Sequence, residues 1–302
     1  MNTTDGSVFS IDIHADDYAL SINTSKEMLE LMHEGVLDSI SIIPNMKCFE
    51  SCMDMLKREI PSLPFLPKMS VHLNLVEGKH ASTWKSLFLA SYNPFRFNKY
   101  KQLLKHEISE QIERVQSQIA ECIDIASSNS IPCSQKHIRI DSHQHTHMIP
   151  IVRKALFECL ASNNLNCEYI RNSREPLVPF ISATSLWKSY SPVNIIKNLI
   201  LNFYSIKIDN YDESENHEPM YLWGLIMSGK MDPYRVEQLY SPLTSKAAKD
   251  NRKLEILFHP GRMLEDELCD EIPISSAQSF YMSSNRDIEK NGARTAKQSQ
   301  SV

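Results

Sequence analysis

The chain has 302 residues, of which 42% are hydrophobic and 23% charged, and its formal net charge at pH 7 is −5. That length is enough for one large domain or two small ones, and the composition is ordinary for a globular protein. The acidic balance, with no block of lysine and arginine, excludes a basic surface for nucleic acid. The apolar stretch 193–204 is too short to span a membrane. The seven cysteines form no CxxC pair and the N-terminus lacks a secretory core, so we expect a cytoplasmic protein with reduced thiols.

Short β-like runs alternate with longer helical patterns along the chain. The predicted strands are 8–17, 38–45, 68–78, 136–145, 167–175, 220–229 and 253–261. The predicted helices are 25–37, 48–60, 106–126, 150–164 and 193–204. We expect the polar tail 291–302 to be disordered. With seven glycines and neither GxGxxG nor GxxxxGK, a dinucleotide or P-loop enzyme is disfavoured.

Repeated strand–helix alternation predicts a single-domain α/β fold with a parallel sheet. About seven units fit an irregular β/α barrel resembling a TIM barrel, and an open, doubly wound sheet is the alternative. In a β/α barrel the active site lies at the carboxyl ends of the strands. Five ionisable residues fall at four such ends: Asp16, Asp17, His72, His143 and His259.

The segment DSHQHTHMIP holds three histidines at alternating positions, His143, His145 and His147. If this segment is extended, the three side chains share one face. A chance polar cluster is the alternative, but histidine is the commonest metal ligand and a general acid or base near neutral pH. The order of the tract, directly after a predicted strand, favours a functional site.

One aspartate with two histidines is a standard open site for a catalytic divalent metal, which lowers the pKa of bound water and polarises a carbonyl. An adjacent second carboxylate can accept the proton of that water. Asp16 and Asp17 suit this division of labour if the chain turns there, and a helix N-cap is their structural alternative. His72 is alternatively a hydrogen-bonded strand residue, and His259 a turn residue rather than an acid for a leaving amine.

The motifs, in order, resemble those of the YdjC-like carbohydrate deacetylases, the family that includes chitooligosaccharide deacetylases. The family's Asn-Ala-Asp-Asp-Phe-Gly stands here as HADDYAL, its Gly-x-His-x-x-Leu as MSVHLNLVEG, and its Asp-Ser/Gly-His-x-His-x-His as DSHQHTHMIP. The segments YIRNSREP, LFHPG and FYMSSNRDIE complete the set, which runs from Ile11 to Glu289. The resemblance implies a deacetylase barrel over residues 8–290, with 176–217 as a possible lid insertion.

The resemblance also implies hydrolysis of an N-acetyl group from an amino sugar, with one divalent metal held by Asp17, His72 and His143. Magnesium is the metal that it implies first, and zinc is the alternative. We expect Asp16 to act as general base and His259 to assist the departing amine. Four residues are expected to bind substrate or to orient the site: Arg171, Glu175, His145 and His147. The partner is then a small acetylated sugar, and we expect neither nucleic acid nor membrane; a homodimer is possible.

Two departures from the family pattern bear on the site. His14 replaces asparagine and offers either another metal ligand or a shift of the Asp16 pKa. Ala19 replaces glycine and would be strained if the turn requires a positive φ. The chain also ends soon after Arg286, where many members continue, so the barrel is expected to close differently or to be covered by a partner subunit.

Three rival functions remain open on the sequence alone. The same residues could hold Fe(II) for oxygen chemistry, although the second aspartate is then unneeded. They could also form another metal-dependent hydrolase, a phosphoesterase or an amidohydrolase. The third rival is a non-catalytic sugar-binding descendant, which the substitutions at His14 and Ala19 keep open.

Overall fold

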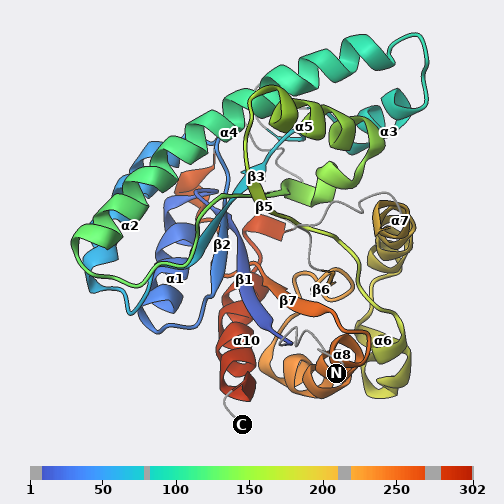
Figure 1. Ribbon diagram of the computed structural model, residues 1–302. Coiled ribbons are helices and arrows are strands. Elements are labelled where there is room, and N and C mark those ends of the chain that lie inside the picture. The colour runs from blue at the N-terminus through green and yellow to red at the C-terminus, as the bar shows by residue number, and fades with distance from the viewer. Residues whose placement is uncertain (1–8, 78–81, 210–218, 269–279, 301–302) are drawn as a thin grey trace, which may run out of the picture.

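Seven parallel strands form a single sheet at the centre of the computed structural model, which describes residues 9–77, 82–209, 219–268 and 280–300 (Figure 1). The strands are β1 (Ile11–Tyr18), β2 (Ser39–Ile42), β3 (Lys68–Leu73), β4 (Ile138–Ser142), β5 (Cys167–Ile170), β6 (Met220–Trp223) and β7 (Lys253–Phe258). Their order across the sheet is β5-β4-β3-β2-β1-β7-β6. The predicted alternation of strands with helices is therefore confirmed, and every strand pair is parallel.

Nine α-helices and four short 3₁₀ turns connect these strands among the described residues. The helices are α1 (Ile22–His33), α2 (Phe49–Glu59), α3 (Trp84–Ser91), α4 (Phe97–Ser128), α5 (Pro150–Ser162), α6 (Val178–Ser182), α7 (Pro192–Asp209), α8 (Pro233–Lys249) and α10 (Asn285–Gln300). The turns are η1 (Ile60–Ser62), η2 (His143–Met148), η3 (Thr184–Ser189) and η4 (Glu265–Glu267). Within the described parts of the chain, no helix is long and apolar enough to cross a membrane.

The sheet curls into a partial barrel whose outer strands are β5 and β6. No strand ladder joins these two strands among the described residues. A backbone hydrogen bond, 2.8 Å long, crosses the gap from the Leu222 amide to the Arg174 carbonyl. The expected parallel α/β sheet is thus present as a partial barrel, and closure into the expected irregular, TIM-like barrel is not confirmed in the described parts of the chain. β5 ends at Ile170, so the strand in the structure is shorter than the predicted strand 167–175.

The two faces of the sheet differ in polarity because apolar and polar residues alternate along the strands. On β1, Ile13 and Ala15 face the helices and belong to the main hydrophobic core. Asp12, His14 and Asp16 face the concave side, and the last two are buried. Other polar residues of this concave side are Ser39, Ser41, Lys68, His72, Arg139, Asp141, Lys253 and Glu255. The barrel interior is therefore an ionic and hydrogen-bonded layer, and the apolar core lies outside it.

Local sequence signals explain where two of the covering helices begin. Ser21 caps α1, and its hydroxyl accepts a hydrogen bond from the Thr24 amide. Asp232 caps α8 in the same way, and Pro233 occupies the first turn, where its missing N–H costs nothing. Both helices then bury one apolar stripe against the sheet.

The prediction that the tail 291–302 is disordered is wrong for the described residues, because α10 is helical through Gln300. The two residues beyond lie outside the described part. Ala293 and Ala296 are fully buried, and α10 contacts α8, β1 and β7. Ion pairs of Arg294 with Glu34 and of Lys297 with Asp38 hold its outer side. The sequence did not predict that this helix packs on the sheet, because small residues rather than large apolar ones make the contact.

Candidate active site

The end of β1 turns sharply and brings both adjacent aspartates to the concave side. Asp17 and Ala19 have left-handed backbones, with φ of 74° and 67°, and the register between β1 and β2 shifts between Ala15 and Tyr18. The turn required for Asp16 and Asp17 to act together is therefore present. Neither aspartate caps α1, since Ser21 does so. The positive φ at Ala19 explains why glycine suits this position in the family pattern.

Asp17, His72 and His143 come together from three elements far apart in the chain. One potential ligand atom from each lies within 4.8 Å of the others, and all three residues are buried. His143 Nδ1 is 3.1 Å and His72 Nε2 3.6 Å from the same oxygen, Asp17 Oδ1. One carboxylate and two imidazoles are a suitable donor set for a divalent metal, so these buried residues could hold one.

The tautomers of the two histidines follow from their outer hydrogen bonds. His72 Nδ1 lies 2.6 Å from Asp141 Oδ1, an acceptor, so this nitrogen carries the proton and Nε2 presents its lone pair. The Tyr281 hydroxyl donates to Glu77 and accepts from His143 Nε2, 2.7 Å away. His143 Nε2 therefore carries a proton, and the hydrogen bond to Asp17 Oδ1 with the raised pKa of the ring places a second proton on Nδ1 in the metal-free protein. His72 Nε2 and His143 Nδ1 both face Asp17, as in carboxylate–histidine–metal arrangements, and a metal bound there would replace the Nδ1 proton.

Asp17 is held from its other side by a residue of α10. Arg286 Nη1 donates to Asp17 Oδ2 over 2.9 Å and Arg286 Nε donates to the Gly261 carbonyl. Burial alone would raise the pKa of the Asp17 carboxyl, but the hydrogen bond with His143 and the charge of Arg286 keep that pKa far below its usual range. The same pairing works on His143, where burial is outweighed by the hydrogen bond with Asp17 and by the nearby carboxylate of Glu77, 3.7 Å away, and the pKa rises to about 10.

Asp16 is paired with Arg171 in a bidentate arrangement. The two guanidinium nitrogens donate to the two carboxylate oxygens over 2.9 and 2.8 Å. Burial raises the pKa of Asp16, but Arg171 and the neighbouring His72 and His14 lower it well below its usual value. Asp16 also faces a cavity that His72 and His143 line. It is therefore an ionised carboxylate beside the candidate metal group.

His14 also has its nitrogens fixed by neighbours, the hydroxyls of Ser39 and Ser41, at 2.6 and 2.7 Å. Each hydroxyl donates its single proton elsewhere, Ser39 to Asp12 and Ser41 to Asp141. Both nitrogens of His14 must then donate, which leaves no lone pair for a metal. His14, Asp16 and Asp141 lie close enough to form a second group, but Arg171 already supplies the positive charge there. Of the two expected roles, the structure supports the shift of the Asp16 pKa.

The histidine tract is not extended, because β4 ends at Ser142 and η2 begins at His143. Gln144 and His145 have left-handed backbones, so the three imidazoles diverge. His143 joins Asp17, and His145 lines the cavity with its Nδ1 3.0 Å from the Ser173 hydroxyl. His147 is fully buried, donates from Nε2 to the Arg171 carbonyl and bonds Ser142 through Nδ1.

Arg171 and Glu175 are fully buried and do not line this cavity. Besides Asp16, Arg171 contacts Asp141 at 3.1 Å and Glu255 at 2.6 Å. Glu175 accepts from the amides of Gly224, Leu225 and Ile226 and from the Asn198 side chain. Both side chains thus have hydrogen-bond partners inside the protein, and their contact with sugar hydroxyls stays a prediction. Arg171 positions Asp16, and Glu175 joins α7 to the turn after β6.

The cavity beside the metal group has a volume of about 280 Å³. Asp16, His72, His143, His145 and His259 line it, which unites the carboxyl ends of β1, β3 and β7 with the turn after β4. Further lining residues are Gln144, Asn194, Lys197, Leu225, Ser228, Phe280 and Tyr281. Among described residues Lys197 has no hydrogen-bonding or ion-pair partner, and burial lowers its pKa to about 8. The cavity thus gathers Asp16, His259 and several polar groups beside the residues that could hold a metal.

The family model of the YdjC-like proteins matches residues 10–122 and 135–293, which is most of the chain. This chain belongs to the YdjC-like family. The crystal structure of an Enterococcus faecalis protein, for which cellobiose-phosphate cleavage was suggested as the role, is similar over 98% of this chain and 95% of that one. The TM-score is 0.57 and the sequence identity 16%, so this likeness concerns the fold. No curated protein matches the chain.

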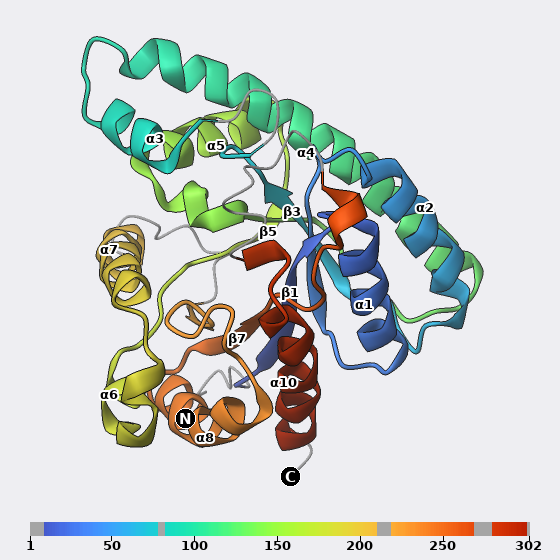
Figure 2. The same ribbon diagram turned by 180° about the vertical axis from the view of Figure 1, so that it is seen from behind.

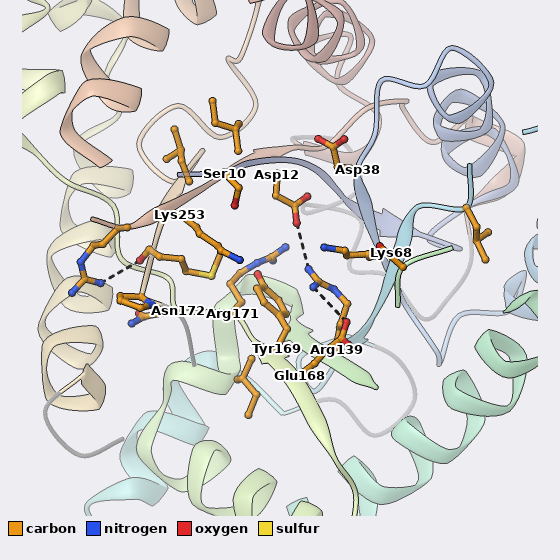
Figure 3. A pocket seen from close by; sticks show the side chains of 18 of the residues that line it. Ser10, Asp12, Asp38, Lys68, Arg139, Glu168, Tyr169, Arg171, Asn172 and Lys253 are labelled. Carbon is orange, nitrogen blue, oxygen red and sulfur yellow. Dashed lines mark hydrogen bonds and ion pairs between the residues drawn. The ribbon is translucent and has the colours of Figure 1, made fainter. Parts of the chain in front are cut away.

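A second and larger cavity of this YdjC-like protein, about 840 Å³, lies at the opposite end of the strands (Figure 3). Lys68, Arg139 and Lys253 point into it alongside Asp12 and Glu168. No histidine lines it, and neither potential metal group among the described residues lies wholly on its wall. In parallel β/α sheets the catalytic groups gather at the carboxyl ends of the strands. We therefore place the candidate active site in the smaller cavity.

The sequence analysis predicted no role for four residues that lie at this site: Glu77, Lys197, Tyr281 and Arg286. Glu77 and Tyr281 fix the His143 ring, and Arg286 fixes Asp17. Tyr281 and Arg286 fall inside the FYMSSNRDIE block, so the resemblance covered them without assigning them a role. Lys197 lies within the apolar stretch 193–204, where no local pattern distinguishes it.

Proposed function

We propose that this protein is a metal-dependent hydrolase that removes the N-acetyl group from an acetylated amino sugar or oligosaccharide. The observation that supports this proposal most is the convergence of two imidazole nitrogens, one each from His72 and His143, on Asp17, with the ionised carboxylate of Asp16 beside them in one cavity. The YdjC-like family membership agrees with a carbohydrate substrate. Two imidazoles and a carboxylate match the ligands of Zn²⁺, whereas Mg²⁺, which prefers oxygen ligands, is the metal that the family resemblance implies first.

Asp17, His72 and His143 would hold the cation, which when bound supplies a water of lowered pKa and polarises the acetamide carbonyl. Asp16 accepts the proton of that water. Because Arg171 keeps its pKa low, Asp16 stays ionised throughout the neutral range and is a weak base. It is therefore suited to a water that is already acidic, rather than to bulk water.

His259 lies in the same cavity and would donate a proton to the departing amine as the carbon–nitrogen bond breaks, leaving acetate and the free amino sugar. Its backbone amide is anchored by Glu289 Oε2 over 2.7 Å, and its ring lies edge-on to Phe280 at 5.4 Å between centroids. Both contacts restrict the position of the imidazole, and neither uses a ring nitrogen.

The polar groups on the far wall of the cavity suit a sugar. Asn194, Lys197 and Ser228 offer donors and acceptors, and Lys197 adds a positive charge. That charge favours a sugar carrying an anionic group such as a phosphate ester, in agreement with the suggested substrate of the Enterococcus protein. Phosphoester hydrolysis on the same metal group is the second candidate function, and Lys197 is the observation that favours it.

Acetate release from N-acetylglucosamine oligomers, neutral and phosphorylated, tests the proposal in the presence of Mg²⁺ or Zn²⁺. Inorganic phosphate is measured in parallel. Acetate release supports deacetylation, phosphate release alone supports the phosphoesterase, and binding without either product supports a sugar-binding descendant.

The role of Asp16 is tested by Asp16→Asn, for which we expect kcat to fall about 100-fold or more while metal still binds. Asp12→Asn is the matched control, because Asp12 lies on the same face of β1 but lines the opposite cavity. Near-normal turnover of Asp16→Asn with metal bound would remove Asp16 from the base role.

A further inference from the structure

The outer face of α7 is the most apolar exposed helix face among the described residues. Val193, Ile196, Leu199, Phe203 and Ile206 are 72%, 58%, 51%, 55% and 47% exposed. From Ile196 onward the spacing is three, four and three residues, the repeat by which two helices pack along a seam. In Figures 1 and 2 α7 stands at the outer edge of the molecule, with no other helix beyond it.

The inner face of the same helix is polar and firmly attached. Asn198 and Asn202 donate to Glu175, and Asn194 donates to the Ile226 carbonyl. Leu201 is fully buried in a small apolar cluster. A surface helix ordinarily turns its apolar stripe inward and its polar side to solvent. In α7 this order is reversed. We call its exposed apolar residues the outer stripe: Val193, Ile196, Leu199, Ile200, Phe203 and Ile206. Contact with the rest of this chain does not explain why these residues are apolar.

The chain itself offers little that would cover the outer stripe. The segments outside the described residues read MNTTDGSV, GKHA, NYDESENHE, CDEIPISSAQS and SV, and are mostly polar. The stripe contains no charged side chain, so two copies of it would meet without repulsion. In a twofold dimer the same patch serves both subunits, and an antiparallel pair of identical helices meets that condition.

The area is also sufficient for a dimer. A large apolar side chain exposes about 200 Å² when free, so the six members of the stripe expose on the order of 600 Å². A stable interface buries about 800 Å² on each partner, including its polar rim. Val178, Ile181 and Trp187, on the neighbouring α6 and η3, are each more than half exposed and would extend the patch. We propose that a second copy of this chain packs on α7 through the outer stripe.

Sedimentation velocity at about 1 to 50 μM tests this proposal on the unmodified full chain, which we expect to be a dimer. The double variant Ile196→Glu/Phe203→Glu places charge in the seam and should raise the dimer dissociation constant at least 100-fold. Leu103→Glu on α4 is the matched control, since Leu103 is 59% exposed outside the stripe and its substitution should leave the dimer intact.

A monomeric unmodified chain at 50 μM would overturn the proposal, whatever the variants do. A dimer that persists in the double variant would overturn it as well, because the interface must then lie elsewhere. Flotation with phosphatidylcholine–phosphatidylglycerol vesicles distinguishes a lipid surface: binding by a monomer that the double variant loses would assign the stripe to membranes instead. Circular dichroism of each variant verifies that its fold is retained.

Discussion

Two imidazole rings in the candidate metal site owe their orientation to residues that do not touch the metal position. Asp141 fixes the His72 ring, and Tyr281 with Glu77 fixes the His143 ring. Such outer partners commonly change metal affinity 10- to 100-fold, about as much as some ligands do. At the scale of single residues, the site is therefore specified by at least six side chains rather than three.

Tyr281→Phe tests this dependence. The variant removes the acceptor for His143 Nε2–H and frees the ring to turn, so we expect metal affinity to fall about tenfold. Isothermal titration with Zn²⁺ or Mg²⁺ measures the change. Tyr92→Phe is the control, because it deletes a Tyr–Tyr hydrogen bond with Tyr204 and leaves the metal group untouched. An unchanged dissociation constant in Tyr281→Phe would show that His143 is held by other contacts.

Individual residues also show what the sequence could predict of the site. Asp17, His72 and His143 follow strand ends of a parallel sheet, so their convergence follows from topology. His145 and His147 could not be placed in the same way, because the left-handed backbone at Gln144 and His145 breaks the strand period. Arg171 was named because it lies in the YIRNSREP block of the family resemblance, and the sequence did not indicate that it would be buried and paired with Asp16.

At the scale of elements, α10 requires a glycine at a position where helix propensity alone would favour alanine. Gly292 lies in the middle of this helix, and a Cβ built there would come within 1.8 Å of the Met231 carbonyl oxygen. The close approach of α10 to the segment before α8 therefore requires glycine. The same helix delivers Arg286 to Asp17, so its packing bears on the site.

Gly292→Ala should destabilise the protein by about 3 kcal/mol or more, since the added methyl overlaps backbone that cannot move freely. Propensity predicts the opposite sign, a gain of about 1 kcal/mol for alanine in a helix. Urea unfolding measures the difference. Gln298→Ala, at an exposed position of the same helix, should be close to neutral. A stable Gly292→Ala protein would mean that α10 sits farther from Met231 than the structure places it.

At the scale of the whole molecule, the curled sheet encloses charge and turns its apolar side outward to the helices. The alternation of polar and apolar residues on β1 was visible in the sequence, and it predicts a strand with two unlike faces. It does not reveal which face of the sheet is concave. Nor does it reveal that Arg171 and Glu255 form an ion pair inside the barrel, so that their charges compensate each other. Closure depends on β5 and β6, whose four-residue lengths carry too weak a periodic signal to predict whether these two edge strands pair.

The enclosed charge makes the stability of the molecule depend on pH and on metal together. His143 has a pKa raised from 6.5 to about 10 by its partners, so the folded protein holds a proton that the unfolded chain releases above pH 6.5. Stability from this group is complete below that pH and is lost as pH rises toward 10. The slope is about 1.4 kcal/mol per pH unit. Lys197, with a pKa lowered to about 8, acts in the opposite direction above pH 8.

Between pH 7 and 8 the metal-free protein should therefore lose melting temperature as pH rises, and His143→Asn should lose much of that dependence. A metal at Asp17, His72 and His143 competes for the nitrogen that holds the proton, so binding releases a proton and strengthens as pH rises. The metal-induced rise in Tm should then grow from pH 7 to 8 in the unmodified protein. Calorimetric titration in two buffers of different ionisation enthalpy counts the protons. A metal-induced Tm shift that is constant with pH, with no proton released, would place the metal away from His143.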